Sequence, residues 1–419
     1  MRPGRGSLLI LGAADGSMAT YRAARQLGYR TIAVDMRGTA PGVALADEHL
    51  SISTREPERI AAALAGRDDL AGVLAPCSDI ALPTQHELAS RFGLPCGLTD
   101  ATVRASVDKP FFRALCDELG LPSYPWTAGA HADQMIRAAA RFRYPVVVKP
   151  TDAQSARGVT RCAGPDEVAA AVTGALAYSY GGSVLIEQEV HGLHCGCECI
   201  VVDGRVAFLA LTERRLSPAP LAVTTGHLMP AQLRAGVAER VESMVNRLCA
   251  RLSYRRGPLN LDLVVDADGV PHMIEMGART GGDPLGELAR RCYGVDPVRA
   301  SIEAAVGAPT LIDASAPHPV MVQILGTDRS GELTEVTGLG RANAMPEVRE
   351  VVVLAEPGHR VEASANMAAK LGYAILAAPS AERLRRAADR LLEVVQFDVM
   401  PSTETVASRP AAEFAGGLA

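Results

Sequence analysis

Residues 259–279, LNLDLVVDADGVPHMIEMGAR, contain two strand-like runs on either side of the dipeptide Asp268-Gly269. Asp-Gly is strongly preferred in the two-residue turn of a β-hairpin. A turn at this dipeptide pairs Asp262 with Glu275 and places both carboxylates on one face, with their Cβ atoms about 5 Å apart. The other face then carries only apolar side chains: Leu261, Leu263, Val265, Ile274 and Met276.

The two facing carboxylates call for a positive partner, because like charges across a ladder repel, by about a kcal/mol or less when solvated. A hard divalent cation with oxygen ligands would satisfy them. Asn260 and Gly277 continue the same face, and Arg279 lies two residues beyond Gly277. A solvated polar face on an ordinary hairpin is the simpler interpretation, and these residues alone leave it open.

Lysine is rare in this chain: of 42 basic residues only Lys109, Lys149 and Lys370 are lysine. A compact ammonium on a flexible stem suits a phosphate oxygen in a tight pocket. Lys109 lies near the start of a predicted helix, and Lys149 ends an apolar strand. Small residues in the loop that follows would let backbone amides approach phosphate oxygens; they are Gln154, Ser155, Ala156, Arg157 and Gly158. Lys370, in the run AAKLG, is predicted to be a surface lysine at a helix end.

The N-terminal hundred residues alternate strands and helices, which predicts a parallel, Rossmann-like sheet with crossover helices. The strands are expected at 7–12, 30–35 and 71–75, and the helices at 20–27 and 57–65. Asp35 would fit a dinucleotide ribose, but the loop GAADGS lacks the GxGxxG fingerprint. We therefore expect a scaffold or substrate lobe that ends near residue 100.

The rest of the chain also mixes helices and strands, so the fold class is α/β. Helices are predicted at 106–120, 230–252 and 380–396, and strands at 145–149, 184–189, 197–202, 205–211, 259–266, 270–277, 319–325 and 349–354.

Four stretches in chain order resemble the ATP-grasp superfamily, and as a set they are specific. They are DKPFFRALCDELGLPSYP (108–125), PVVVKPTDAQSARGV (145–159), VLIEQEVHG (184–192) and IEMGARTGGD (274–283). The region 319–400, with LTEVTGLG and PEVREVVVL, is similar to the C-terminal domain of bacterial L-amino acid ligases, which make dipeptides.

This resemblance implies an ATP-grasp fold built from four segments. They are an N-terminal Rossmann-like preATP-grasp domain (1–105), an ATP-grasp domain (106–310) with a lid subdomain at about 128–190, a small α+β C-terminal domain (311–402) and a flexible tail (403–419).

The resemblance also implies how ATP is held. Lys109 and Lys149 would bind its phosphates, and the loop 153–158 would close over them. The hinge Glu187-Gln188-Glu189-Val190 would hold adenine through backbone groups, with the Val190 amide on the ring. His194 stands where the family usually has a glutamate that binds the ribose, and Glu198 is a second candidate for that role.

Metal and substrate roles follow from the same resemblance. Asp262 and Glu275 would bind magnesium, with Glu275 bridging two ions and Mn²⁺ as a possible substitute. The family's usual asparagine ligand is Gly277 here, so that ligand is missing or is replaced, with Asn260 across the hairpin as a candidate. Arg279 would stabilise the transferred phosphate and the tetrahedral intermediate. The substrate-side candidates are Arg214, His227, Gly281 and Gly282, in a turn that ends at Asp283.

These roles imply an ATP-dependent carboxylate–amine ligase that joins two amino acids, or an amino acid and a related amine or acid, through an acyl phosphate. ADP and phosphate would be released. One alternative is a purine-pathway type of ATP-grasp enzyme that uses bicarbonate or formate. Another is a non-catalytic ATP-binding protein, which the departures at His194 and Gly277 motivate.

Composition limits the partners and the compartment. The net charge of −5 gives no indication of a nucleic-acid or membrane-surface partner, and no apolar run is long enough to span a membrane. Cys195, Cys197 and Cys199 alternate on one strand face, which favours buried small apolar residues over metal ligands. An odd count of nine cysteines fits free thiols and a cytoplasmic protein. The resemblance adds the expectation of a homodimer.

Overall fold

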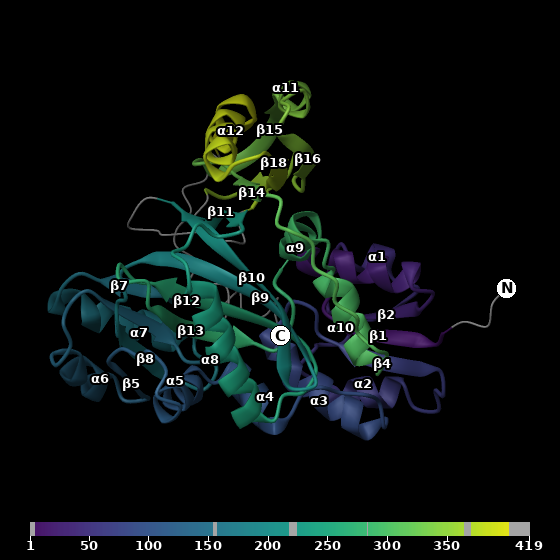
Figure 1. Ribbon diagram of the computed structural model, residues 1–419, viewed down its shortest axis with the longest axis horizontal. Coiled ribbons are helices and arrows are strands. Elements are labelled where there is room, and N and C mark those ends of the chain that lie inside the picture. The colour runs from purple at the N-terminus through teal and green to yellow at the C-terminus, as the bar shows by residue number, and fades with distance from the viewer. Residues whose placement is uncertain (1–4, 154–156, 218–223, 283, 364–369, 402–419) are drawn as a thin grey trace.

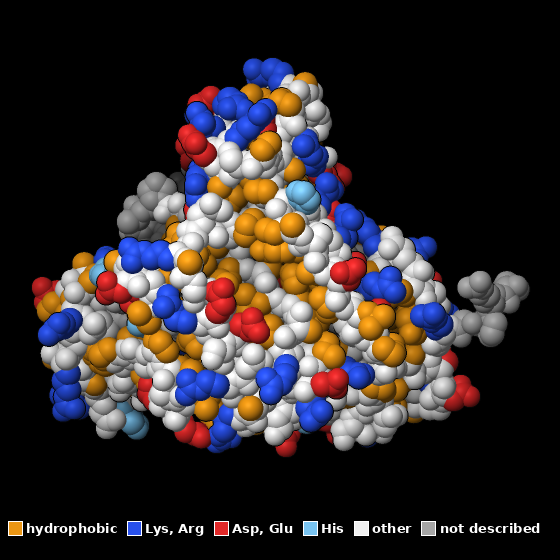
Figure 2. All heavy atoms as spheres, viewed as in Figure 1, with side chains coloured by type: hydrophobic (Ala, Val, Ile, Leu, Met, Phe, Trp, Pro, Cys, Tyr) orange, Lys and Arg blue, Asp and Glu red, His pale blue; other side chains and the backbone are white. Residues whose placement is uncertain are grey.

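The computed structural model describes residues 5–153, 157–217, 224–282, 284–363 and 370–401. Figure 1 shows the N-terminal helices on one side of the molecule, the helices α6 and α7 on the other, and α12 above the central strands. No helix in these described ranges is long and apolar enough to cross a membrane. Side chains of both charge signs are interspersed over the face seen in Figure 2.

The N-terminal sheet is parallel, with the strand order β3-β2-β1-β4, as the alternation predicted. Its strands are β1 (Ser7–Leu11), β2 (Arg30–Val34), β3 (Glu48–Leu50) and β4 (Leu70–Leu74). Its helices are α1 (Met18–Gln26), α2 (Pro57–Ala63) and α3 (Leu82–Arg91). The strand order reverses between β1 and β4, and in such sheets ligands bind at the carboxyl ends of the strands near that point.

A second sheet of four strands, ordered β5-β8-β6-β7, lies within the region expected to form a lid. Its strands are β5 (Trp126–Gly129), β6 (Val146–Pro150), β7 (Thr160–Cys162) and β8 (Val184–Gln188), and α6 (Ala132–Ala139) and α7 (Val168–Tyr178) pack on it. Lys149 is therefore a strand residue of β6, as its apolar neighbours predicted.

The central sheet has eight strands, ordered β13-β12-β9-β10-β11-β14-β18-β16, and every neighbouring pair is antiparallel. The strands are β9 (Leu193–Val202), β10 (Arg205–Leu216), β11 (Thr224–Met229), β12 (Gly257–Val265), β13 (Pro271–Gly277), β14 (Val320–Leu325), β16 (Val348–Val353) and β18 (Gly372–Ala377). Strand β11 pairs directly with β14, so this sheet runs from the hairpin into the C-terminal region.

Helices cover both faces of the central sheet. One face packs on α8 (Val237–Leu252) and, farther along, on α12 (Ala381–Val394). The other face is covered at one end by α9 (Leu285–Tyr293). Further elements are α10 (Pro297–Ala305), α11 (Leu339–Asn343) and a three-stranded sheet of β15 (Gly331–Thr337), β17 (Arg360–Val361) and β19 (Gln396–Pro401).

The cysteines behave as the alternation predicted. Cys195, Cys197 and Cys199 are at most 1% exposed and pack in the core against α8. They are free thiols, and among the described residues no group of three or more His, Cys, Asp or Glu could hold a metal ion.

The helix predicted at 106–120 is present as α5 (Lys109–Glu118), but it begins later than predicted, because residues 106–107 end a separate helix, α4 (Asp100–Val107). The Asp108 side chain accepts a hydrogen bond from the Phe111 amide and caps α5, and Pro110 occupies its first turn. Lys109 is thus the first residue of a new helix. Helix α8 also begins later than predicted, at Val237, after Gly236 in the left-handed conformation.

The hairpin turn differs from the prediction, but the predicted pairing of Asp262 with Glu275 is confirmed. The Asp266 amide donates to the Val270 carbonyl, and the Asp266 side chain accepts from the Val270 amide, so the loop is longer than two residues. Near the loop Val265 pairs with Pro271, one residue out of the predicted register. A bulge restores the register, and Asp262 lies opposite Glu275 as predicted.

Candidate functional site

One face of the central sheet carries most of the predicted site residues. Asp262 on β12 lies between Glu275 on β13 and Gly196 on β9. Asn260 lies two residues away, between Gly277 and Glu198. Because alternate strand residues point to the same face, these side chains form two adjacent rows, and the cysteines of β9 point to the opposite face.

The facing carboxylates are compensated by two cations. Arg214 on β10 donates to Asp262 Oδ1, and Lys109 Nζ lies 3.7 Å from Glu275 Oε2. Loss of hydration raises the pKa of Asp262 even with Arg214 beside it. The net pKa of Glu275 is lowered: loss of hydration acts to raise it, but Lys109 and other nearby cations have the larger effect. The positive charge expected from the sequence is present as side chains.

The donor set suits magnesium bound together with phosphates. Two carboxylates are too few to enclose an ion, in keeping with the absence of a three-ligand cluster among the described residues. Mg²⁺ is usually bound by one or two carboxylates with substrate phosphates and waters completing the shell. The Glu275 side chain is 43% exposed and Asp262 is 20% exposed, so both oxygen sets can be reached.

Arg279 is fixed in place by an aspartate that the sequence interpretation missed. Its Nε donates to Asp79 Oδ1 at 2.9 Å and its Nη2 to Asp79 Oδ2 at 2.8 Å, a bidentate pair. Its Nη1 donates to Asn260 Oδ1 at 2.7 Å. Asp79 follows β4, at the carboxyl end of the parallel sheet, which is the position in the sequence that could have identified it.

The same aspartate accounts for the glycine at position 277. A Cβ built on Gly277 would lie closer than 3.0 Å to Asp79 Oδ1. Both polar atoms of Asn260, the candidate replacement for the family's asparagine, have partners: its amide nitrogen donates to Glu198 and its oxygen accepts from Arg279. The space that an asparagine would need holds the partner of Arg279 instead.

Glu198 lies under this arrangement rather than beside an open ribose position. It is 2% exposed and accepts from Asn260 Nδ2 at 2.6 Å and from the Gly281 amide at 3.1 Å. Burial raises the pKa of Glu198 to about 7, against the hydrogen bonds that lower it. A Cβ on Gly281 would lie closer than 3.0 Å to Glu198 Oε1, so a side chain there would force the Glu198 carboxylate to shift.

The two predicted phosphate lysines lie at the lid side of this face. Lys109 Nζ donates to the Ala153 carbonyl at 2.9 Å, where the small-residue loop begins. Lys149 is 6% exposed, and its Nζ lies 2.5 Å from Glu187 Oε2. Glu187 therefore has a side-chain role in addition to the backbone role expected from the sequence.

The hinge and loop residues are partly described. The Gln188 amide donates to the Pro125 carbonyl at 2.9 Å, and Val190 follows β8 two residues later. Gln154, Ser155 and Ala156 lie outside the described residues. Arg157 is half-buried just before β7, and Gly158 is in the left-handed region with φ of 69°.

Two histidines occupy different surroundings. His227 on β11 is 7% exposed, and its Nδ1 lies 3.1 Å from Thr212 Oγ1. Burial and the nearby Arg214 lower the pKa of His227 to about 3, so this imidazole is neutral at pH 7. His194 is exposed and lies opposite Val264, beyond the carboxylate rows.

Lys370 is not the surface lysine at a helix end that the sequence predicted. Its side chain is 11% exposed, and its Nζ lies 2.6 Å from Asp15 Oδ2 and 5.7 Å from the ring centre of Tyr373. Asp15 belongs to the loop after β1, so the pair joins the C-terminal region to the N-terminal sheet. A contact between residues so distant in sequence leaves no local pattern.

The strand ends of the parallel sheet form a charge-balanced edge. Asp15 is paired with Lys370, and Asp79 with Arg279. Asp35, which directly follows β2, is paired with Arg37 at 3.1 Å. The loop after β13 is tied to this edge, because Thr280 Oγ1 donates to the Pro76 carbonyl at 2.5 Å.

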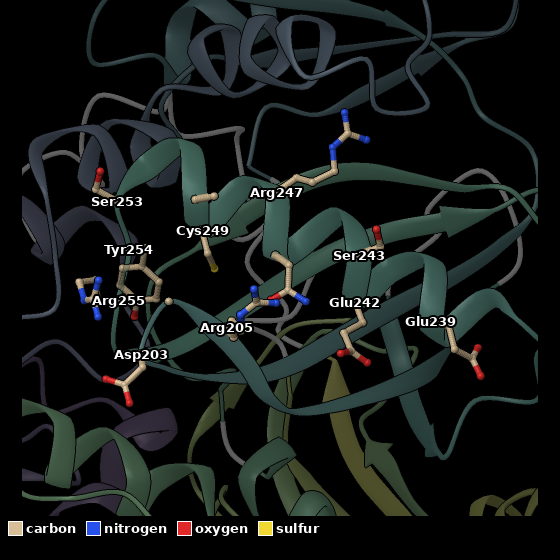
Figure 3. A pocket seen from close by; sticks show the side chains of 13 residues that line it. Asp203, Arg205, Glu239, Glu242, Ser243, Arg247, Cys249, Ser253, Tyr254 and Arg255 are labelled. Atoms are coloured by element: carbon tan, nitrogen blue, oxygen red, sulfur yellow. The ribbon is translucent and has the colours of Figure 1, made fainter.

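A separate hollow of about 980 Å³ lies on the α8 side of the central sheet, away from the carboxylate rows. Figure 3 shows Glu239, Glu242, Ser243 and Arg247 along α8, with Asp203 and Arg205 at the neighbouring turn. None of the predicted site residues lines it.

Comparisons with known proteins agree with this geometry. Residues 142–286 match the family described as "ATP-grasp domain", and residues 323–400 match "L-amino acid ligase C-terminal domain 2". The chain is similar in structure to an L-amino acid ligase from Bacillus licheniformis, with a TM-score of 0.80, 18% identity, and coverage of 95% of this chain and 100% of that one.

Two curated relatives are also similar. Uncharacterized protein y4rH of Sinorhizobium fredii is 26% identical over 344 residues, which span 80% of this chain and 70% of that protein. A formate-dependent phosphoribosylglycinamide formyltransferase of Mycolicibacterium smegmatis is 32% identical over 187 residues, which span 44% of this chain and 46% of the relative. The chain thus matches less than half the length of that formyltransferase.

The match of residues 142–286 identifies an ATP-grasp domain in this chain, and together with the fold it confirms the fold class and the resemblance inferred from the sequence. ATP-grasp ligases are ATP-dependent enzymes that form C–N bonds, and the expected enzyme class is confirmed at this level. Within the class, the chain carries the C-terminal domain of the L-amino acid ligases.

Adjacent glycines provide a matched test of the support under Arg279. Gly281→Ala should lower the free energy of unfolding by about 1–3 kcal/mol, because its Cβ overlaps the buried Glu198 carboxylate. Gly282→Ala should be close to wild type, since nothing lies within 4 Å of a Cβ there. Urea denaturation of both variants measures the difference, and equal losses of stability would contradict the assignment.

The pH dependence of stability tests the burial of Glu198. The pKa of Glu198 is about 7 in the folded protein and 4.5 in the unfolded chain. Its contribution to the free energy of unfolding is therefore fully present below pH 4.5 and is lost as the pH rises to about 7, because the folded state must then bury a charged carboxylate. The loss amounts to about 3 kcal/mol. Denaturation at several pH values should show a smaller decline for Glu198→Gln than for wild type or the exposed control Glu332→Gln. An unchanged decline in Glu198→Gln would exclude a raised pKa.

Proposed function

We propose that this protein is an ATP-dependent ligase that joins two amino acids, or an amino acid and a related amine or acid, releasing ADP and phosphate. The observation that carries the proposal is the pairing of β11 with β14, the strand in which the match to the L-amino acid ligase type of C-terminal domain begins, at Gln323. In that pairing Val322 lies opposite His227, on the sheet that carries Asp262 and Glu275. The C-terminal domain thus extends the surface on which the reaction would take place.

The nucleotide side of the site has the groups that a phosphoryl transfer needs. Lys109 and Lys149 would neutralise phosphate oxygens, and Lys149 would exchange part of its contact with Glu187 for them. Asp262 and Glu275 would hold magnesium, for which the resemblance implies two ions, and Mn²⁺ has the same preference for carboxylate oxygens. Bound magnesium would reduce the negative charge that opposes attack on the γ-phosphate.

The reaction would have two steps. A substrate carboxylate oxygen attacks the γ-phosphorus, the bond to the bridging oxygen breaks, and ADP leaves. The amine nitrogen of the second substrate then attacks the acyl carbon and loses a proton, and inorganic phosphate leaves. Arg279, held by Asp79 and Asn260, would stabilise the transferred phosphate and the tetrahedral oxyanion that forms when the amine attacks, because a preorganised donor needs no reorganisation during the reaction.

The substrate side favours an uncharged or zwitterionic ligand over a phosphoribosyl dianion. At the strand ends, Asp15, Asp35 and Asp79 are each paired with one cation, so the edge is balanced in charge. His227 is neutral and would act through hydrogen bonds, and Gly281 and Gly282 would offer backbone groups. Arg214 donates a hydrogen bond to Asp262, so it would be shared between this carboxylate and a substrate carboxylate. The homodimer and the cytoplasmic location stay predictions of the sequence.

The first test is ADP release with magnesium and pairs of the twenty L-amino acids, then non-standard ones, with mass spectrometry of products. We expect turnover that requires two amino acids and gives a product of their summed mass less water. Glu275→Gln and Arg279→Ala should each lower turnover at least about 100-fold, whereas the exposed control Glu332→Gln should not.

Two outcomes would overturn this proposal. Turnover with formate and phosphoribosylglycinamide, and none with any amino acid pair, would assign the chain to the chemistry named for its formyltransferase relative. Binding of ATP with no turnover in either assay would indicate a non-catalytic ATP-binding protein.

A further inference from the structure

Strand β13 contains a bulge that decides where Glu275 points. Asp262 pairs with Glu275, but the next residue, Leu263, pairs with Met273, so Ile274 is left as an extra residue. Without the bulge, the register near the turn would place Ile274 opposite Asp262 and rotate Glu275 to the core face of the sheet. The second carboxylate of the site therefore depends on one extra residue in one strand.

A buried arginine binds both carbonyl groups at this bulge. Arg113 Nη2 donates to the Met273 carbonyl and, at 3.1 Å, to the Ile274 carbonyl. Arg113 is 1% exposed and lies on α5, the helix that begins at Lys109. The Tyr124 hydroxyl lies 3.5 Å from the same Met273 carbonyl, and its ring centre is 5.0 Å from the Arg113 guanidinium carbon.

Arg113 also connects the bulge to the nucleotide side of the site. Its Nε lies 3.7 Å from Glu187 Oε1, while Lys149 binds the other oxygen of that carboxylate. Its Nε and Nη1 have no hydrogen-bond partner in the described part of the chain. Its Nη2 contacts Cys116 Sγ on the same helix at 3.9 Å, and its hydrogen bonds to oxygen go to the two carbonyls of the bulge. Burying a cation costs free energy unless hydrogen bonds or an opposite charge compensate it. Here the Met273 and Ile274 carbonyls at the bulge are its oxygen acceptors.

We propose that Arg113 is a positioning residue: it clamps the bulge of β13 and thereby keeps the Glu275 carboxylate on the ligand face, opposite Asp262. Its role in metal binding rests on the proposed function, but its role in holding the bulge does not. Arg113 acts through Glu275, and the reacting groups are not among its contacts.

The test compares Arg113→Met and Arg113→Lys with Arg240→Met. Arg240 Nη2 donates to the Gly269 carbonyl at 2.7 Å, so the control removes an arginine–carbonyl bond from the same hairpin, but at its turn. Calorimetric titration with ADP over a range of MgCl₂ concentrations measures the magnesium requirement. Hydrogen exchange of the amides at 271–279 measures the bulge directly, without any need for activity.

Arg113→Met should raise the magnesium concentration for half-maximal ADP binding about tenfold or more, and should speed exchange at 273–277. Arg113→Lys should recover part of both losses, and Arg240→Met should match wild type. An Arg113→Met variant with a wild-type melting curve, magnesium requirement and exchange pattern would overturn the inference. If the wild-type protein binds no ADP in the presence of magnesium, the proposed function fails. The clamp is tested separately by hydrogen exchange: exchange rates unchanged from wild type in Arg113→Met would overturn it. If Arg113→Met does not fold, the same comparison is made with Arg113→Lys.

Discussion

Two carboxylates, Asp262 and Glu275, face each other across neighbouring strands and repel each other. Cationic side chains around them offset this repulsion. Arg214 binds one and Lys109 approaches the other. Each of these cations comes from a different element, β10 and α5, so the carboxylate pair also connects separate parts of the chain. Since both carboxylates stay partly exposed, the compensation leaves room for phosphates and magnesium.

The N-terminal sheet contributes to the site through support rather than through a nucleotide loop of its own. Asp79 from the end of β4 holds Arg279, and Arg279 in turn holds Asn260, whose amide binds Glu198. The chain of contacts crosses from the parallel sheet to the central sheet. The glycine at 277 follows from it, because Asp79 fills the space that a side chain there would need. A departure from the family pattern thus has a steric cause.

Local patterns in the sequence were sufficient for part of the elements and for the carboxylate pair. Strand–helix alternation predicted the parallel sheet, and the hairpin predicted Asp262 opposite Glu275. The predicted two-residue turn was wrong, because the Asp266 side chain accepts hydrogen bonds from backbone amides of a longer loop. The bulge in β13 nevertheless restores the expected pairing. The break between α4 and α5 could have been identified from Asp108 and Pro110, which are an N-cap and a first-turn residue.

Long-range partners could not be predicted in this way. Asp79 and Arg279 are 200 residues apart, and Asp15 and Lys370 belong to opposite ends of the chain, so no spacing rule connects them. Arg113 shows the same limit in another form. In sequence it is one charged residue of an amphipathic helix, and only the packing of α5 against β13 shows that it is buried on the bulge.

The central claim is that the facing carboxylates serve the transfer of phosphate to a substrate carboxylate, and oxygen transfer tests it most directly. An amino acid labelled with ¹⁸O in its carboxylate is incubated with ATP, magnesium and the second amino acid. The account predicts that one ¹⁸O atom appears in inorganic phosphate for each amide bond formed. Amide product accompanied by unlabelled phosphate, or by label in AMP, would contradict it.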